Sequence, residues 1–162
     1  MTNNTKLYKV KPSELRPDWH VIDVADKVLG RISSEIATIL QGKRKVLYTR
    51  YLLTGDFVVV INASKVRVTG GNKLKQMTYY RHTGYPGGLR QHQLVQMLEK
   101  HPERVIKHAV KGMLPQGKLG KHMLRRLKVY AGDTHPHEAQ VRGSLKARGM
   151  APDQTAEEQK EE

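Results

Sequence analysis

The sequence predicts a layered α/β domain with parallel strand pairing, on three observations. Residues 19–24 are rich in β-branched side chains, which is typical of a strand. Residues 26–42 carry apolar side chains at three- and four-residue spacing, which is typical of a helix with one buried face. Residues 57–61 are apolar throughout, as in a strand that is covered on both faces. A strand, a helix and a fully buried strand in this order favour parallel pairing.

We expect the first helix to be capped by Asp26 and to end at Gly42, because these residue types suit the two ends of a helix. Its apolar face consists of Val28, Leu29, Ile32, Ile36, Ile39 and Leu40. One such face is enough to pack the helix against a sheet.

The middle of the chain predicts more strands. Residues 65–69 alternate between basic and apolar side chains and predict a short strand, and residues 76–83 predict another. Residues 83–88 contain three glycines and a proline, which favour a loop. A helix is expected after this loop, with an inward face of Leu94, Val95 and Leu98.

The last third predicts two helices and a closing strand. Pro102 and Glu103 suit the first turn of a helix that Pro115 ends. A shorter helix is expected over 118–127 and a strand over 128–130. The first of these helices has an apolar side and, beside it, a basic stripe of Arg104, Lys107, His108 and Lys111. From about Glu138 onward the apolar periodicity is lost, and we expect no regular structure there.

The composition excludes several classes of protein. The chain has 162 residues and no cysteine, which excludes a disulfide framework and any thiolate metal site. No apolar run approaches the roughly 18 residues that cross a membrane, and the first eleven residues lack the apolar core of a signal peptide. We therefore expect a cytoplasmic protein without a membrane partner.

The charge is the most informative property. The net charge of +14 becomes +18 when the last twelve residues, with five acids and one lysine, are set aside. No acid occurs between Asp56 and Glu99, and none between Glu103 and Asp133. Surfaces that meet only solvent usually mix the two signs, so long acid-free stretches indicate a polyanionic partner, most simply nucleic acid.

Two motifs are candidates for contact with phosphate. The first is the cation cluster Lys43, Arg44, Lys45 and Arg50. The dipole of the preceding helix explains one or two cations there but not four. Together these cations could displace counterions from a nucleic acid.

The second motif is a glycine loop with flanking cations, formed by Arg81, His82, Tyr85, Gly87, Gly88 and Arg90. Glycine lets the backbone approach phosphate or ribose closely, and an exposed tyrosine can stack on an unpaired base. The alternative is an ordinary turn with a packed tyrosine.

Other motifs carry less chemistry. Residues 69–73 lack the spacing of a phosphate loop, so a basic turn between strands is favoured. His135 and His137 are only two of the three or four ligands that a metal site needs. We find no carboxylate pair or nucleophile set for catalysis. A nucleotide-using enzyme on a Rossmann-like sheet and a DNA-binding regulator are the alternatives, and neither has its motif here.

The segments 110–121 and 127–132 closely resemble the signature of the L-thirteen family of large-subunit ribosomal proteins. Further landmarks resemble the family in the family's order, from Trp19–Asp23 through Thr54–Asp56 and His82–Gly84 to Pro102–Arg104. The resemblance covers residues 9–140, which we expect to form a single RNA-binding domain. Residues 1–8 would then be an N-terminal extension, and residues 141–162 a polar, acidic-ended, flexible tail.

The resemblance implies a three-layer α/β/α fold with a mainly parallel four-stranded sheet. It implies a structural component of the 50S subunit that binds 23S rRNA early in assembly, beside other ribosomal proteins. Enzymatic activity, cofactors, metals, small-molecule substrates and homo-oligomers are not expected. From the basic motifs and the resemblance together, we expect contacts with rRNA from Lys43, Arg44, Lys45, Arg50, Lys73, Lys75, Arg81, His82, Tyr85, Gly87, Gly88, Arg90, Lys111, Lys118, Lys121, His122, Arg125, Arg126 and Lys128.

Overall fold

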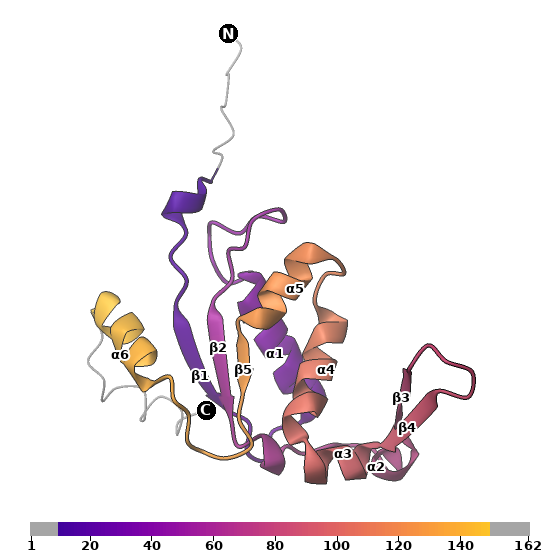
Figure 1. The fold of residues 1–162 in the computed structure, drawn as a ribbon. Coiled ribbons are helices and arrows are strands. Elements are labelled where there is room, and N and C mark those ends of the chain that lie inside the picture. The colour runs from indigo at the N-terminus through magenta and orange to yellow at the C-terminus, as the bar shows by residue number, and fades with distance from the viewer. Residues whose placement is uncertain (1–9, 150–162) are drawn as a thin grey trace.

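The computed structural model, which describes residues 10–149, is built on a parallel sheet of three strands. The strands are β1 (Trp19–Asp23), β2 (Phe57–Ile61) and β5 (Leu127–Val129), in the order β1-β2-β5 (Figure 1). The middle strand is covered on both faces, because Val58, Val59 and Val60 are fully buried. The predicted class and the predicted parallel pairing are therefore confirmed.

Three helices pack together on the sheet: α1 (Leu29–Gln41), α4 (Pro102–Met113) and α5 (Lys118–Arg125) (Figure 1). The helix α3 (Leu94–Lys100) leads into α4. The core that they share with the sheet includes Ile32, Ile36, Leu40, Val58, Val60, Leu94, Val105, Ile106 and Val110. The helices expected in the last third of the chain are confirmed, and Val105, Ile106 and Val110 of α4 are buried.

The two ends of α1 differ in how well they were predicted. Gly42 ends the helix in the left-handed conformation, with φ of 77°, as expected for a glycine at this position. Asp26 does not cap the helix, which starts at Leu29. A parallel bridge between Val28 and Arg67 holds Val28 in the extended conformation, so the helix starts two residues later than expected.

The prediction of a fourth strand in this sheet was wrong. Residues 65–69 form only the isolated bridge at Arg67, after a short 3-10 turn at Ala63–Lys65. The strand expected over 76–83 exists as β3 (Thr78–His82), but it pairs with β4 (Leu89–Gln93) in a separate antiparallel hairpin. No strand was expected at β4, because its polar residues do not alternate with apolar ones. A short helix, α2 (Lys73–Gln76), precedes this hairpin.

The C-terminal part contains a helix where no regular structure was expected. Helix α6 (Glu138–Ala147) lies beside β1, on the side away from β2 (Figure 1). The amide of Trp19 donates a hydrogen bond to Ser144 Oγ at 3.0 Å, and Leu145 is buried. These contacts with a distant strand stabilise a helix that has only a weak apolar face of its own. The predicted extension over residues 1–8 and the end of the predicted tail, from residue 150, lie outside the described residues.

Candidate nucleic-acid interface

A groove between α4, α5 and β5 brings together the cations of the second acid-free stretch. Its basic lining consists of Lys107, Lys111, Lys121, Arg125 and Lys128. Glu103 is the one acid in the lining, and Lys107 Nζ lies 3.9 Å from its carboxylate. The groove therefore presents an excess of positive charge along two helices and a strand edge.

The turn between α4 and α5 explains why this groove has its shape. Gly117 has φ of 124°, a conformation that favours glycine. A Cβ atom on Gly120 would lie 1.8 Å from the carbonyl oxygen of Pro115, so only glycine allows α5 to pack this closely against the turn. The close packing brings Lys121 of α5 toward Lys111 of α4. The spacing of Pro115, Gly117 and Gly120 is thus a requirement of the turn.

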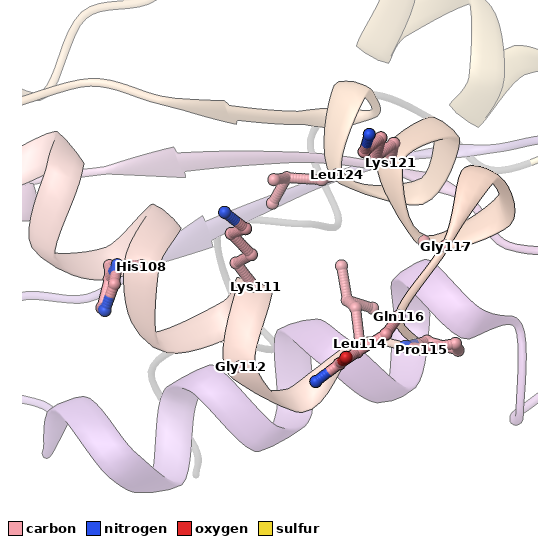
Figure 2. Close-up of a pocket in the computed structure, with 10 residues that line it drawn as sticks. His108, Lys111, Gly112, Leu114, Pro115, Gln116, Gly117, Lys121 and Leu124 are labelled. Carbon is pink, nitrogen blue, oxygen red and sulfur yellow. The ribbon is translucent and has the colours of Figure 1, made fainter. Parts of the chain in front are cut away.

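A hollow of about 370 Å³ lies at this turn and joins the groove (Figure 2). Leu114, Pro115 and Leu124 give it a mainly apolar lining, and Lys111 and Lys121 belong to both the hollow and the groove. The sequence did not predict this hollow. Its signal, visible only afterwards, is the combination of leucine, proline and glycine between two basic helices.

The loop after α1 lies on the other side of the same turn. Lys43 and Arg50 line a second depression together with Pro115 and Met123. Arg44 is exposed, and Val46 is fully exposed, although it is apolar. The loop and the hollow are therefore neighbours across Pro115, although they are far apart along the chain.

Lys45, although it belongs to the same cluster, points into the protein. Its Nζ lies 2.5 Å from Asp56 Oδ1 and 4.0 Å from Asp18 Oδ2, and it donates a hydrogen bond to the Arg16 carbonyl. Burial by itself would raise the pKa of Asp56. Hydrogen bonds from His20, Lys45 and the Asp18 amide outweigh this effect, and the pKa lies below its ordinary value of 3.8. Lys45 thus has a partner for its charge within the chain.

Arg126, like Lys45, makes contacts inside the protein, whereas its neighbour Arg125 does not. The Arg126 guanidinium donates a hydrogen bond to the carbonyl of Gly55 and lies 5.1 Å from the centre of the Phe57 ring. Burial lowers the pKa of Arg126, and the nearby carboxylate of Asp56 partly offsets this effect. Arg125 is exposed and lines the groove. Of the two consecutive arginines, only Arg125 is placed to contact a partner without leaving an internal contact.

The hairpin β3–β4 presents the glycine loop away from the sheet (Figure 1). Arg81 and Arg90 are directly opposite each other across the two strands. At its base, the Tyr79 ring meets the His108 ring of α4 edge to face, with 4.9 Å between centres. Tyr85 is 77% exposed at the tip, so the alternative of a packed tyrosine is wrong.

The remaining predicted residues are distributed between these regions. His82, Gly87, Lys73 and Lys75 are exposed on or beside the hairpin, and Gly88 uses its amide to bond the Tyr85 carbonyl at 2.9 Å. The exposed residues of α5 include Lys118 and His122. Lys107 was missed among the expected contact residues, although its spacing of four from Lys111 signals a shared helix face.

The histidines and helices give no other kind of site. His137 forms a hydrogen bond with the Tyr130 hydroxyl at 2.8 Å and packs against Trp19. These contacts give His137 a structural role. Within residues 10–149, no group of three or more His, Cys, Asp or Glu side chains could hold a metal ion. In the same range, no helix is long and apolar enough to cross a bilayer.

Taken together, the fold and this face define a basic α/β protein with a surface complementary to a polyanion. A family model described as "Ribosomal protein L13" matches residues 17–136. The chain belongs to this family, which confirms the resemblance seen in the sequence. The family consists of ribosomal proteins and not enzymes, in agreement with the predicted lack of catalysis.

Curated relatives cover most of the chain. The "Large ribosomal subunit protein uL13" of Syntrophotalea carbinolica is 58% identical over 130 residues, which are 80% of this chain and 91% of the relative. The protein of the same name from Hahella chejuensis is 54% identical over 141 residues, which are 87% of this chain and 99% of the relative. That of Aromatoleum aromaticum is 53% identical over 135 residues, 83% of this chain and 94% of the relative.

Proposed function

We propose that this protein is a structural constituent of the large ribosomal subunit, where it binds and orders segments of 23S rRNA during early assembly. The observation that carries the proposal is the groove of Lys107, Lys111, Lys121, Arg125 and Lys128 with its single acid. The names of the relatives, which place them in the large ribosomal subunit, support it. This places the protein in the cytoplasm, as part of the ribosome.

The proposed mechanism is electrostatic and geometric. The sheet and its helices hold three basic regions at fixed positions: the groove, the loop over residues 43–50 and the hairpin β3–β4. Each region would contact phosphates and riboses of a different RNA segment, and the rigid core would set the orientation of the segments. Specificity would come from RNA shape rather than from reading base sequence.

Neighbouring ribosomal proteins are the second kind of partner that we propose, and the protein would act as a single copy. It would need no cofactor, because the binding that we propose requires only fixed positive charge and backbone donors.

The test is binding to a 23S rRNA transcript over a range of salt concentrations. If about eight phosphates are neutralised, affinity should fall by orders of magnitude between roughly 50 and 200 mM salt. The triple variant K111E/K121E/R125E should bind at least about a hundredfold more weakly. The matched control is K27E/R31E/K146E, with the same change in net charge at exposed positions outside the groove.

Equal losses in the two triple variants would mean that net charge, and not the groove, determines binding. A salt-insensitive affinity would contradict the mechanism as a whole. Co-sedimentation with the large subunit at moderate salt is the expected result in cells. A preference for duplex DNA over folded RNA would favour a DNA-binding regulator instead.

A further inference from the structure

The hollow at the α4–α5 turn has a chemistry different from that of the groove it joins. The groove is lined mainly by cations, whereas Leu114, Pro115 and Leu124 make the hollow mainly apolar. Figure 2 shows Leu114 and Leu124 facing the space between the helices, with Lys111 and Lys121 on the side of Leu124. Phosphates alone do not require such an apolar depression.

We infer that this hollow binds the base of one unpaired RNA nucleotide, whose phosphate is held by Lys111 and Lys121. The inference rests on the proposed function, because it assigns a ligand to one part of the same surface. Unpaired bases are the elements that proteins take out of folded RNA, with an apolar or aromatic contact to the ring and cations on the backbone.

The size and the lining of the hollow fit this occupant. Its volume of about 370 Å³ lies at the small end of the range for small-molecule sites, large enough for a single heterocycle. The His108 ring belongs to the lining, and it also contacts the Tyr79 ring. No carboxylate lines the hollow, and the one acid of the joined groove, Glu103, lies 3.9 Å from Lys107 Nζ. An apolar side chain of a neighbouring protein would leave the two lysines without a partner, and we therefore favour a nucleotide.

Gly112 allows a test that leaves the charge unchanged. It lines the hollow from the last turns of α4, and a Cβ atom added there would meet nothing within 4 Å. The Cβ atom of a phenylalanine at this position would therefore meet no other atom, and its ring is intended to compete with a ligand for the hollow. Gly143 on α6 is a matched control, since it is also helical, exposed and open around an added Cβ atom. G112A adds only one methyl group and serves as a control for size.

The experiment compares the full chain and its variants in binding to a 23S rRNA transcript, with probing of unpaired A and C by dimethyl sulfate and of unpaired G and U by a carbodiimide. G112F should weaken binding about tenfold, as expected for the loss of one base contact. The slope of affinity against salt should not change, because no cation is lost. One or a few unpaired bases should become reactive. G143F and G112A should bind as the unaltered chain does.

Q116F is a second way to fill the hollow, from the exposed turn, and should give the same footprint if G112F fails to fold. Unchanged affinity and reactivity in a folded filled variant would overturn the inference, because the hollow would then be empty or hold a protein side chain. A weaker affinity without any newly reactive base would overturn it as well. If the unaltered chain itself shows no salt-dependent binding, the proposed function fails, which is a separate outcome.

Discussion

Lys45 Nζ lies 2.5 Å from Asp56 Oδ1, so a lysine from the basic loop after α1 forms an internal ion pair with the residue that precedes β2. The Asp56 side chain is only 8% exposed, and it also accepts hydrogen bonds from His20 and from the amide of Asp18. These contacts hold the loop after α1 against the N-terminal ends of β1 and β2.

The ion pair predicts a pH dependence of stability. The pKa of Asp56 is lowered on folding, because its hydrogen bonds outweigh the opposing effect of burial. Its contribution is therefore present above the ordinary pKa of 3.8 and lost as the pH falls through the lower folded pKa. D56N should unfold more easily by about 1–3 kcal/mol at pH 7. Urea unfolding at pH 7, 5 and 3 should show this difference shrinking at pH 3. A difference that stays constant with pH would contradict the lowered pKa of Asp56. E35Q, at an exposed carboxylate, is the control and should show no such pH dependence.

The consecutive arginines should separate folding from binding. R126A removes the hydrogen bond to Gly55 and the contact with Phe57, and should lower the free energy of unfolding by about 1.5–3 kcal/mol. R125A should change stability by less than about 0.5 kcal/mol but weaken RNA binding, because Arg125 is exposed in the groove. Thermal unfolding and RNA binding, measured on both variants, test whether Arg126 acts in folding and Arg125 in binding. The reverse pattern would mean that Arg126 leaves its internal site on binding.

The α4–α5 turn should be intolerant of a single methyl group at one glycine and tolerant at another. G120A places a Cβ atom 1.8 Å from the Pro115 carbonyl oxygen, so α5 must shift, and we expect a loss of at least about 2 kcal/mol. G112A meets nothing within 4 Å and should be neutral or stabilising by about 0.5–1 kcal/mol, since alanine favours a helix more than glycine does. Chemical denaturation measures both. Equal effects would show that the backbones are not in this close contact.

The hairpin should respond in opposite ways in the free protein and in the complex. Arg81 and Arg90 are opposite each other, and like charges in this position destabilise a strand pair that is already marginal by itself. R90E replaces the repulsion with an attraction and should slow amide hydrogen exchange in β3 and β4. The same change should weaken RNA binding. Q91E, which adds an acid on the other face of β4, is the control and should not slow exchange.

Patterns within short stretches were enough to predict most of the elements. The run Phe57–Ile61 predicted a strand buried on both faces, and Gly42 predicted the end of α1, because a continuous apolar run and the backbone freedom of glycine are local properties. The acid-free stretch up to Asp133 predicted a positively charged surface, and the cations of this stretch line the groove. These predictions need no knowledge of which segments meet.

Two elements depended on which distant segments meet. The expected fourth strand became half of a separate hairpin, because β4 supplies the partner for β3 and its polar sequence gives no sign of a strand. Helix α6 forms against β1 through Ser144 and Leu145, although its own sequence has little periodicity.

The sequence by itself determined the α/β class, the positive charge and the family, because periodicity, composition and ordered motifs are written along the chain. Only the tertiary structure decided which cations face outward. Lys45 and Arg126 look like their neighbours in sequence, but Asp56 and Gly55 lie beside them in the fold. A charge is available to a partner only if no group in the folded chain has already neutralised it, and that depends on contacts between residues far apart in sequence.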